Sequence, residues 1–146
     1  MLPRTLFSLE HEQFRDSVRR FIEKEITPHH ERWEDQGMVD RDIWTKAGAA
    51  GMLCANLPEV YGGYGADYLY NVVITEELSA AGVTGPGFAV HSEMVATYIA
   101  TFGTEEQKLK WLPGMAAGTV IGALGLTEPS AGSDLKNIRT RAVRQG

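Results

Sequence analysis

The residues best suited to chemistry lie together near the carboxyl-terminal end, in the run Thr127 to Asp134 (TEPSAGSD). This run consists of turn-forming and hydroxyl-bearing residues, and it follows an apolar stretch from Val120 to Leu126. A strand that ends in such a turn leaves backbone N–H and C=O groups unpaired. Together with the hydroxyls of Thr127, Ser130 and Ser133, these groups would form a dense surface of hydrogen-bonding groups.

Two interpretations of this run remain open. The surface would suit a flat ring with a polar edge, such as the pyrimidine edge of a flavin, whose electronics fixed backbone dipoles can tune. The run could also be an ordinary hairpin loop whose hydroxyls cap nearby backbone groups. On the residues alone, the ordinary loop is the favoured interpretation.

The elements that must position this run are mainly helical. Apolar residues at helical spacing predict five helices, over residues 9–35, 41–50, 68–81, 88–102 and from 105 to near Pro113. Pro28 should break the first helix between Ile26 and His29, because proline cannot donate to the helical ladder. N-caps are expected at four positions, Ser8, Asp40, Asp67 and Thr104.

The periodicity changes after Gly118. Val120 to Leu126 reads as a short buried strand, and Ile138 to Val143 as a second one. Because a lone strand pair is marginal in water, the sheet is expected to continue past Gly146. The chain is therefore expected to be a fragment of a longer protein.

Composition narrows the class of protein. The 146 residues carry a formal net charge of -5, which disfavours nucleic-acid binding, and Arg15, Arg19 and Arg20 are interpreted as a solvated face. The single cysteine, Cys54, is expected to be a buried apolar residue. No histidine spacing predicts a metal site. The absence of a long apolar run and of targeting features leads to the expectation of a cytoplasmic protein that does not enter membranes.

Glu76 and Glu77 are adjacent on a predicted helix, so they point in different directions and are interpreted as structural rather than catalytic. His91 is interpreted as a packed helix histidine. None of these three residues is expected to be catalytic.

Three separated motifs resemble those of the acyl-CoA dehydrogenase family, and the resemblance covers essentially all of the chain. Gly125 to Asp134 (GLTEPSAGSD) is similar to the family signature of Thr-Glu-Pro, two small residues and Gly-Ser-Asp. Gly103 to Lys108 with Trp111-Leu112-Pro113, and Pro58-Glu59 with Tyr61-Gly62-Gly63, resemble two further family stretches. The segment from Gly85 to Ser92 looks most like the long-chain branch.

The resemblance implies a fold and a reaction. The fold would be mainly α, with residues 1–118 forming the amino-terminal helical domain and residues 119–146 beginning a middle β domain. The reaction would be α,β-dehydrogenation of an acyl-CoA thioester with FAD as cofactor. The electron acceptor would be an electron-transfer flavoprotein or a similar protein, and the full-length protein would be a homo-oligomer.

The resemblance also assigns site residues. Thr127 would place its hydroxyl and N–H near the reactive flavin nitrogen, and Ser133 would also meet the bound acyl-CoA. No residue of this chain would be catalytic, because the family's base is a Glu of the carboxyl-terminal helical domain. The FAD-lining residues would be Leu124, Gly125, Leu126, Thr127, Glu128, Pro129, Ser130, Ala131, Gly132 and Ser133.

Two other functions stay open at this point. A non-catalytic helical module derived from that family would dimerise through its unpaired strand edge. Acyl-CoA oxidases and flavin monooxygenases share the architecture, although the intact motif favours the dehydrogenase. In every case the isolated chain is expected to bind FAD weakly or not at all, because half of a cofactor-binding site lacks much of the contact and pre-organisation that affinity requires.

Overall fold

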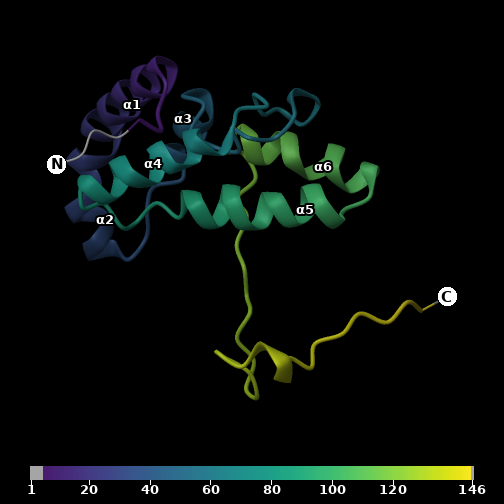
Figure 1. The fold of residues 1–146 in the computed structure, drawn as a ribbon. Helices are drawn as coiled ribbons and strands as arrows, with labels where there is room; N and C mark the ends of the chain where they lie inside the picture. The colour runs from purple at the N-terminus through teal and green to yellow at the C-terminus, as the bar shows by residue number, and fades with distance from the viewer. Residues whose placement is uncertain (1–4, 146) are drawn as a thin grey trace.

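The computed structural model describes residues 5–145 and is mainly helical, as the sequence predicts. The helices gather in one bundle, from which the chain runs out to the carboxyl terminus (Figure 1). No helix among these residues is long and apolar enough to cross a bilayer. The α-helices are α1 (Leu9–Phe21), α2 (His30–Gln36), α3 (Asp42–Ala49), α4 (Tyr68–Ala80), α5 (Ala96–Phe102) and α6 (Glu105–Ala116).

The first helix begins and breaks where the sequence predicts. The Ser8 side chain accepts a hydrogen bond from the His11 backbone N–H, and the His11 ring accepts one from the Ser8 N–H at 3.0 Å. This reciprocal pair closes a capping box. At the other end, a π-helical segment (Ile22–Ile26) leads into a 3-10 turn (Thr27–His29) that contains Pro28 and separates α1 from α2.

The start of α3 differs from the prediction. Asp40 is not its N-cap: the cap is Arg41, and no side chain bonds to the helix start there. The Asp40 carboxylate instead accepts two hydrogen bonds from the Arg32 guanidinium, and Nη1 lies 3.1 Å from Oδ1. This contact holds the pKa of Asp40 well below its ordinary range. A guanidinium that binds both carboxylate oxygens is a stronger partner than one backbone N–H.

Apolar side chains form two buried clusters. The predicted buried face of α3 is confirmed, because Ile43, Trp44 and Ala47 are all buried. The larger cluster comprises Val18, Ile22, Ile26, Trp33, Ile43, Trp44, Ala47, Met52, Leu53, Val73, Ile74, Val83 and Phe88. The smaller cluster joins α5 and α6 to the loop after α3 and comprises Cys54, Leu57, Ala96, Leu112, Met115 and Ala116.

The predicted helix from Phe88 to Phe102 is present, with a π-helical segment (Val90–Val95) that leads into α5. Phe88 and His91 are fully buried, whereas Tyr98 and Phe102 are 54% and 78% exposed. One end of this long helix therefore sits in the core, and the other presents aromatic side chains at the surface.

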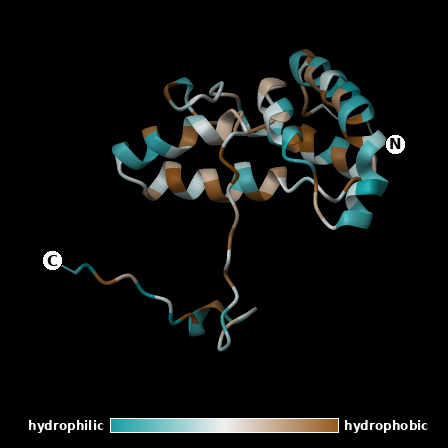
Figure 2. Ribbon diagram, turned by 180° about the vertical axis from the view of Figure 1, so that it is seen from behind, coloured by the Kyte–Doolittle hydropathy of each residue, from teal (hydrophilic) through white to brown (hydrophobic). Residues whose placement is uncertain are grey.

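The two predicted strands are absent from the described residues. Val120 to Leu126 and Ile138 to Val143 have no regular secondary structure, and the first stretch is half-buried or exposed rather than buried. Figure 2 shows that the chain leaving the bundle is apolar to neutral, which is why its sequence reads as a strand. A strand needs a partner ladder, and the only bridge within residues 5–145 joins Glu128 to Ala131.

A cluster of ion pairs fastens α1 to α4. Arg15 Nη1 lies 2.9 Å from Glu76 Oε2 and 3.0 Å from Glu77 Oε1, and Arg19 Nε lies 3.0 Å from Glu77 Oε2. The Arg15 side chain is only 12% exposed, so interpreting it as part of a solvated face is wrong. The structural interpretation of Glu76 and Glu77 agrees with these contacts.

A Glu77→Gln substitution is expected to lower the free energy of unfolding by about 2 kcal/mol, because it removes the charge shared by Arg15 and Arg19. Burial raises the pKa of Glu77, but hydrogen bonds from Arg19 and Arg15 outweigh burial and lower it below 4.5. The stabilisation is therefore present above pH 4.5 and is lost as pH falls through the lowered pKa.

Urea unfolding at neutral and acidic pH measures this difference. Asp16→Asn is the control, since Asp16 is 63% exposed and lies 3.6 Å from Arg19, and it should cost a few tenths of a kcal/mol, roughly. The two variants should not lose the same free energy of unfolding, and the loss in Glu77→Gln should not grow on acidification. Either result would contradict the ion pairs assigned to Glu77.

Candidate functional site

The predicted site residues lie on the chain that leaves the bundle after α6 (Figure 1). From Leu124 to Ser133 most side chains are exposed, while Leu124 and Glu128 are half-buried and Ala131 is buried. The segment from Leu124 to Ser133, named here the edge segment, therefore presents its polar groups away from the helices.

The edge segment contains a tight turn. The backbone N–H of Glu128 donates to the Ala131 carbonyl at 2.8 Å, and the Ala131 N–H donates back to the Glu128 carbonyl at 3.1 Å. Pro129 and Ser130 occupy the two corner positions between them. The turn chemistry predicted for this run is thus confirmed, because a proline followed by a small polar residue suits a reversal of the chain.

Glu128 and Asp134 both accept hydrogen bonds close to this turn. Glu128 accepts hydrogen bonds from the backbone N–H groups of Arg139 and Thr140, at 2.8 and 2.9 Å. Asp134 accepts one from the Asn137 side chain at 2.5 Å. Both carboxylates are thereby engaged within the segment and its immediate continuation.

Protonation of Glu128 should release the later chain from the turn. Hydrogen bonds from Thr140 and Arg139 lower the pKa of Glu128 below its ordinary value of 4.5. The contacts are therefore expected to persist above pH 4.5 and to be lost as pH falls through the lowered pKa. Amide chemical shifts of Arg139 and Thr140, followed by NMR during acid titration, measure this midpoint.

Glu128→Gln is the matched variant, since it should remove the titration of both amides. The assignment would be wrong if the wild-type midpoint fell at or above 4.5, or if the two amides did not respond to pH.

The donor groups of the edge segment are accessible. The backbone N–H groups from Ala123 to Thr127, and the hydroxyls of Thr127 and Ser133, make no hydrogen bond to another residue within 5–145. A Cβ placed on Gly125 or Gly132 would meet no atom within 4 Å, so the backbone lies open there. This donor set can bind the polar edge of a flat group.

A second feature is the exposed flank of the helix that ends in α5. Met94, Thr97, Tyr98 and Thr101 line a groove of about 360 Å³ on this flank, together with Glu93 and Phe102. The Glu93 carboxylate accepts hydrogen bonds from the hydroxyls of Tyr68 and Thr75. Glu93 is therefore tied to α4, at the edge of the groove.

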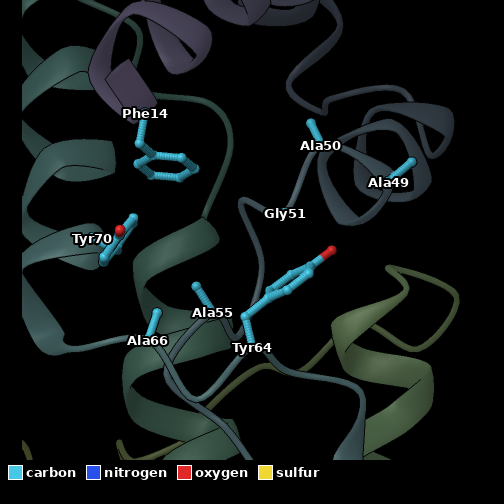
Figure 3. Close-up of a pocket in the computed structure, with 8 residues that line it drawn as sticks. All are labelled: Phe14, Ala49, Ala50, Gly51, Ala55, Tyr64, Ala66 and Tyr70. Atoms are coloured by element: carbon cyan, nitrogen blue, oxygen red, sulfur yellow. The ribbon is translucent and has the colours of Figure 1, made fainter. Parts of the chain in front are cut away.

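Another pocket, of about 470 Å³, lies elsewhere, between α1, α3, α4 and the loop after α3 (Figure 3). The rings of Phe14 and Tyr70 lie together on one side of it, with centroids 5.1 Å apart, and Tyr64 lies on the other. Its lining comprises Phe14, Ala49, Ala50, Gly51, Ala55, Tyr64, Ala66 and Tyr70, none of which carries a carboxylate, imidazole or thiol. This cavity offers no acid–base pair.

Cys54 is a buried residue, as predicted, and burial raises the pKa of its thiol to about 11. It adopts a φ of 53°, a left-handed conformation that no local sequence signal predicts. No group of three His, Cys, Asp or Glu side chains within residues 5–145 could hold a metal ion. A buried thiol with a raised pKa is a poor nucleophile, so Cys54 is not a candidate catalytic residue.

Comparison with known proteins adds independent findings. Residues 8–119 match the family described as "Acyl-CoA dehydrogenase, N-terminal domain". The chain is 50% identical over 143 residues to the mitochondrial long-chain specific acyl-CoA dehydrogenase of Mus musculus, a match that covers 98% of this chain and 33% of the mouse protein. The chain therefore spans about a third of the length of this curated relative.

Two solved structures share the fold. An acyl-CoA dehydrogenase from Geobacillus kaustophilus superposes with a TM-score of 0.86 and 46% identity, covering 93% of this chain and 36% of that one. A glutaryl-CoA dehydrogenase from Mycobacterium smegmatis in complex with FADH2 gives a TM-score of 0.85 and 32% identity, covering 97% and 36%.

Proposed function

Because this chain belongs to the acyl-CoA dehydrogenase family, we propose that it forms part of an FAD-dependent enzyme that dehydrogenates an acyl-CoA thioester between its α and β carbons. The observation that carries the proposal is the 50% identity to a long-chain acyl-CoA dehydrogenase over 98% of the chain. Long-chain acyl-CoA is accordingly the proposed substrate class.

The chemistry of the edge segment fits FAD. The pyrimidine edge of a flavin carries hydrogen-bond acceptors together with one donor. The segment offers accessible N–H groups and hydroxyls on open backbone at Gly125 and Gly132. We assign FAD binding to Leu124 through Ser133, with Thr127 donating from its hydroxyl and N–H near the reactive ring nitrogen.

When bound, FAD would supply the acceptor for the hydride that leaves the β carbon. The protein's own part is to bind and orient. Thr127 would present donors to the flavin edge, and Ser133 would meet the acyl-CoA beside it. Glu128 holds the turn through Arg139 and Thr140. Fixed donors of this kind need no rearrangement during the reaction and therefore stabilise developing charge.

Removal of the α proton needs a carboxylate base held over the substrate. Two of the described carboxylates already have partners. Glu77 pairs with Arg15 and Arg19, and Glu128 accepts hydrogen bonds from backbone amides. We propose that the base is a Glu contributed from outside residues 5–145, and that no described residue is catalytic.

Three further features are proposed on family membership. Residues 1–118 would form the helical domain and residues 119–146 would begin the β domain. The electron acceptor would be an electron-transfer flavoprotein or a similar protein, and the whole protein would be a homo-oligomer. A cytoplasmic location stays a prediction, and the mouse relative is a mitochondrial protein.

Anaerobic reduction of the whole flavin-loaded protein by saturated acyl-CoA thioesters tests this function. Long-chain acyl-CoA should bleach the visible flavin absorbance in the absence of any other reductant, and the matching enoyl-CoA should appear as product. Retention of oxidised flavin with every chain length would refute the dehydrogenase. Sedimentation of the flavin-free chain as a dimer would then favour the helical interaction module.

A further inference from the structure

His91 lies at the junction between the helical bundle and the edge segment. The ring is fully buried, on the π-helical segment Val90–Val95. Its Nε2 lies 3.1 Å from the carbonyl oxygen of Met115, near the end of α6. Its Nδ1 lies 3.0 Å from the backbone nitrogen of Gly122, two residues before Leu124. One imidazole thus joins the long helix, the end of α6 and the departing chain.

The two partners define the protonation of the ring. A carbonyl only accepts, so the Nε2 of His91 carries the hydrogen that points at Met115. A backbone amide only donates, so Nδ1 presents a lone pair to Gly122. His91 therefore belongs in the neutral Nε2–H form.

The surroundings favour this neutral form. Among the described residues, the Cys54 thiol lies against the ring, with Sγ 3.8 Å from Nε2, and the Trp44 ring lies 5.2 Å away between centroids. Cys54 is the titratable one of the two, and no charged group is among these contacts. Burial lowers the pKa of His91 below 6.5, although the bond to Met115 opposes this.

At Gly122 the departing chain packs tightly against side chains of the bundle. A Cβ at this position would lie 2.8 Å from Met115 Cε and 2.8 Å from Val95 Cγ1. Beyond it, Ala123 is exposed, and the next backbone hydrogen bond along the described chain is the one donated by Glu128. Gly122 is therefore the last residue at which the bundle holds the chain before the edge segment begins.

We propose that His91 is a positioning residue of the flavin site, which acts through Gly122 by fixing the point and direction from which Leu124 to Ser133 leave the bundle. The effect of His91 on flavin binding rests on the proposed function. The anchoring contact itself stands on the geometry of His91, Met115 and Gly122. His91 would touch neither flavin nor substrate.

Two substitutions test the two hydrogen bonds of the His91 ring separately. In His91→Asn the amide oxygen takes the place of Nδ1 and keeps an acceptor for Gly122, whereas in His91→Gln the amide nitrogen takes the place of Nε2 and keeps a donor for Met115. Each variant retains one buried hydrogen bond, so the pair is matched for polarity. Only His91→Gln should release the edge segment.

The first readout is amide hydrogen exchange of the 146-residue chain without flavin. His91→Gln should accelerate exchange at Gly122 by about tenfold or more, while His91→Asn should stay within about threefold of wild type. In wild type, long-range ¹⁵N NMR correlations should show Nδ1 unprotonated and Nε2 protonated, a measurement that needs no variant. A proton on Nδ1, or equal Gly122 exchange in the two variants, would overturn the anchor.

The second readout is the whole flavin-loaded protein. His91→Gln should lower kcat by about tenfold with little change in KM and should shift the flavin absorbance, and His91→Asn should restore both to near wild type. Altered Gly122 exchange without any flavin effect would overturn the positioning role alone. If acyl-CoA did not reduce the flavin of the wild-type protein, the proposed function would be refuted instead. Amide exchange at Gly122 would still test the hydrogen bond between Gly122 and His91.

Discussion

Gly118→Ala is expected to lower the free energy of unfolding by about 4 kcal/mol. Gly118 follows the end of α6 and has a φ of 71°, a left-handed conformation that is unfavourable for residues with a Cβ. An added Cβ would lie 2.0 Å from the Trp44 carbonyl oxygen and 2.4 Å from its carbon. These are backbone atoms of α3, so relief requires α3 and α6 to separate.

Gly37→Ala is the matched control for this substitution. Gly37 has the same φ of 71°, but a Cβ there would meet nothing within 4 Å. It should therefore cost only the conformational part, about 1 kcal/mol. Urea or guanidinium unfolding of the three proteins measures both values. Equal losses in Gly118→Ala and Gly37→Ala would show that α3 and the end of α6 are not held together as described.

Thr127→Val is expected to lower kcat of the whole flavin-loaded protein by about a hundredfold, because it removes one fixed donor from the proposed flavin edge. Valine keeps the shape of the side chain, and Thr127 is exposed, so the bundle should be unaffected. Thr127→Ser retains the hydroxyl and should stay within about fivefold of wild type, roughly the difference expected from a lost methyl contact.

Ser133→Ala extends this comparison to the second proposed contact and should add a rise in KM for acyl-CoA, since Ser133 is assigned to meet the substrate. Stopped-flow reduction of the flavin by acyl-CoA reports the chemical step directly. If Thr127→Val and Ser133→Ala both reduced flavin at the wild-type rate, the edge segment would have no part in the reaction.

Local signals in the sequence were sufficient for most of the fold. The capping boxes at Ser8 with His11 and at Thr104 with Gln107 each lie within a few residues, so the chain carries the whole signal in one place. The break at Pro28 follows from the missing N–H of a single residue. The turn at Glu128 to Ala131 likewise follows from its own residues.

Contacts between distant residues were not predictable. Asp40 has a favourable residue type for a cap, but Arg32, eight residues away, binds its carboxylate instead. The bond from Gly122 to His91 spans 31 residues, and no spacing rule indicates it. The stretch from Val120 to Leu126 has the composition of a strand, yet a strand forms only against a partner, which periodicity cannot reveal.

The site was predictable in part for the same reason. The residue types from Leu124 to Ser133 and their turn chemistry can be read from the sequence, whereas the hydrogen bonds from Arg139 and Thr140 to Glu128 appear only in the folded chain. The direction in which this segment leaves the bundle depends on packing at Gly118 and Gly122 against α3 and α6. That packing is a property of the folded chain.

The most direct test of the central claim is a crystal structure of the whole protein grown with FAD. The account predicts that backbone N–H groups between Leu124 and Ser133, and the Thr127 hydroxyl, lie within hydrogen-bond distance of the pyrimidine edge and reactive nitrogen of the flavin. A structure in which the flavin ring binds elsewhere, with Thr127 and Ser133 contacting only solvent or other protein segments, would contradict it.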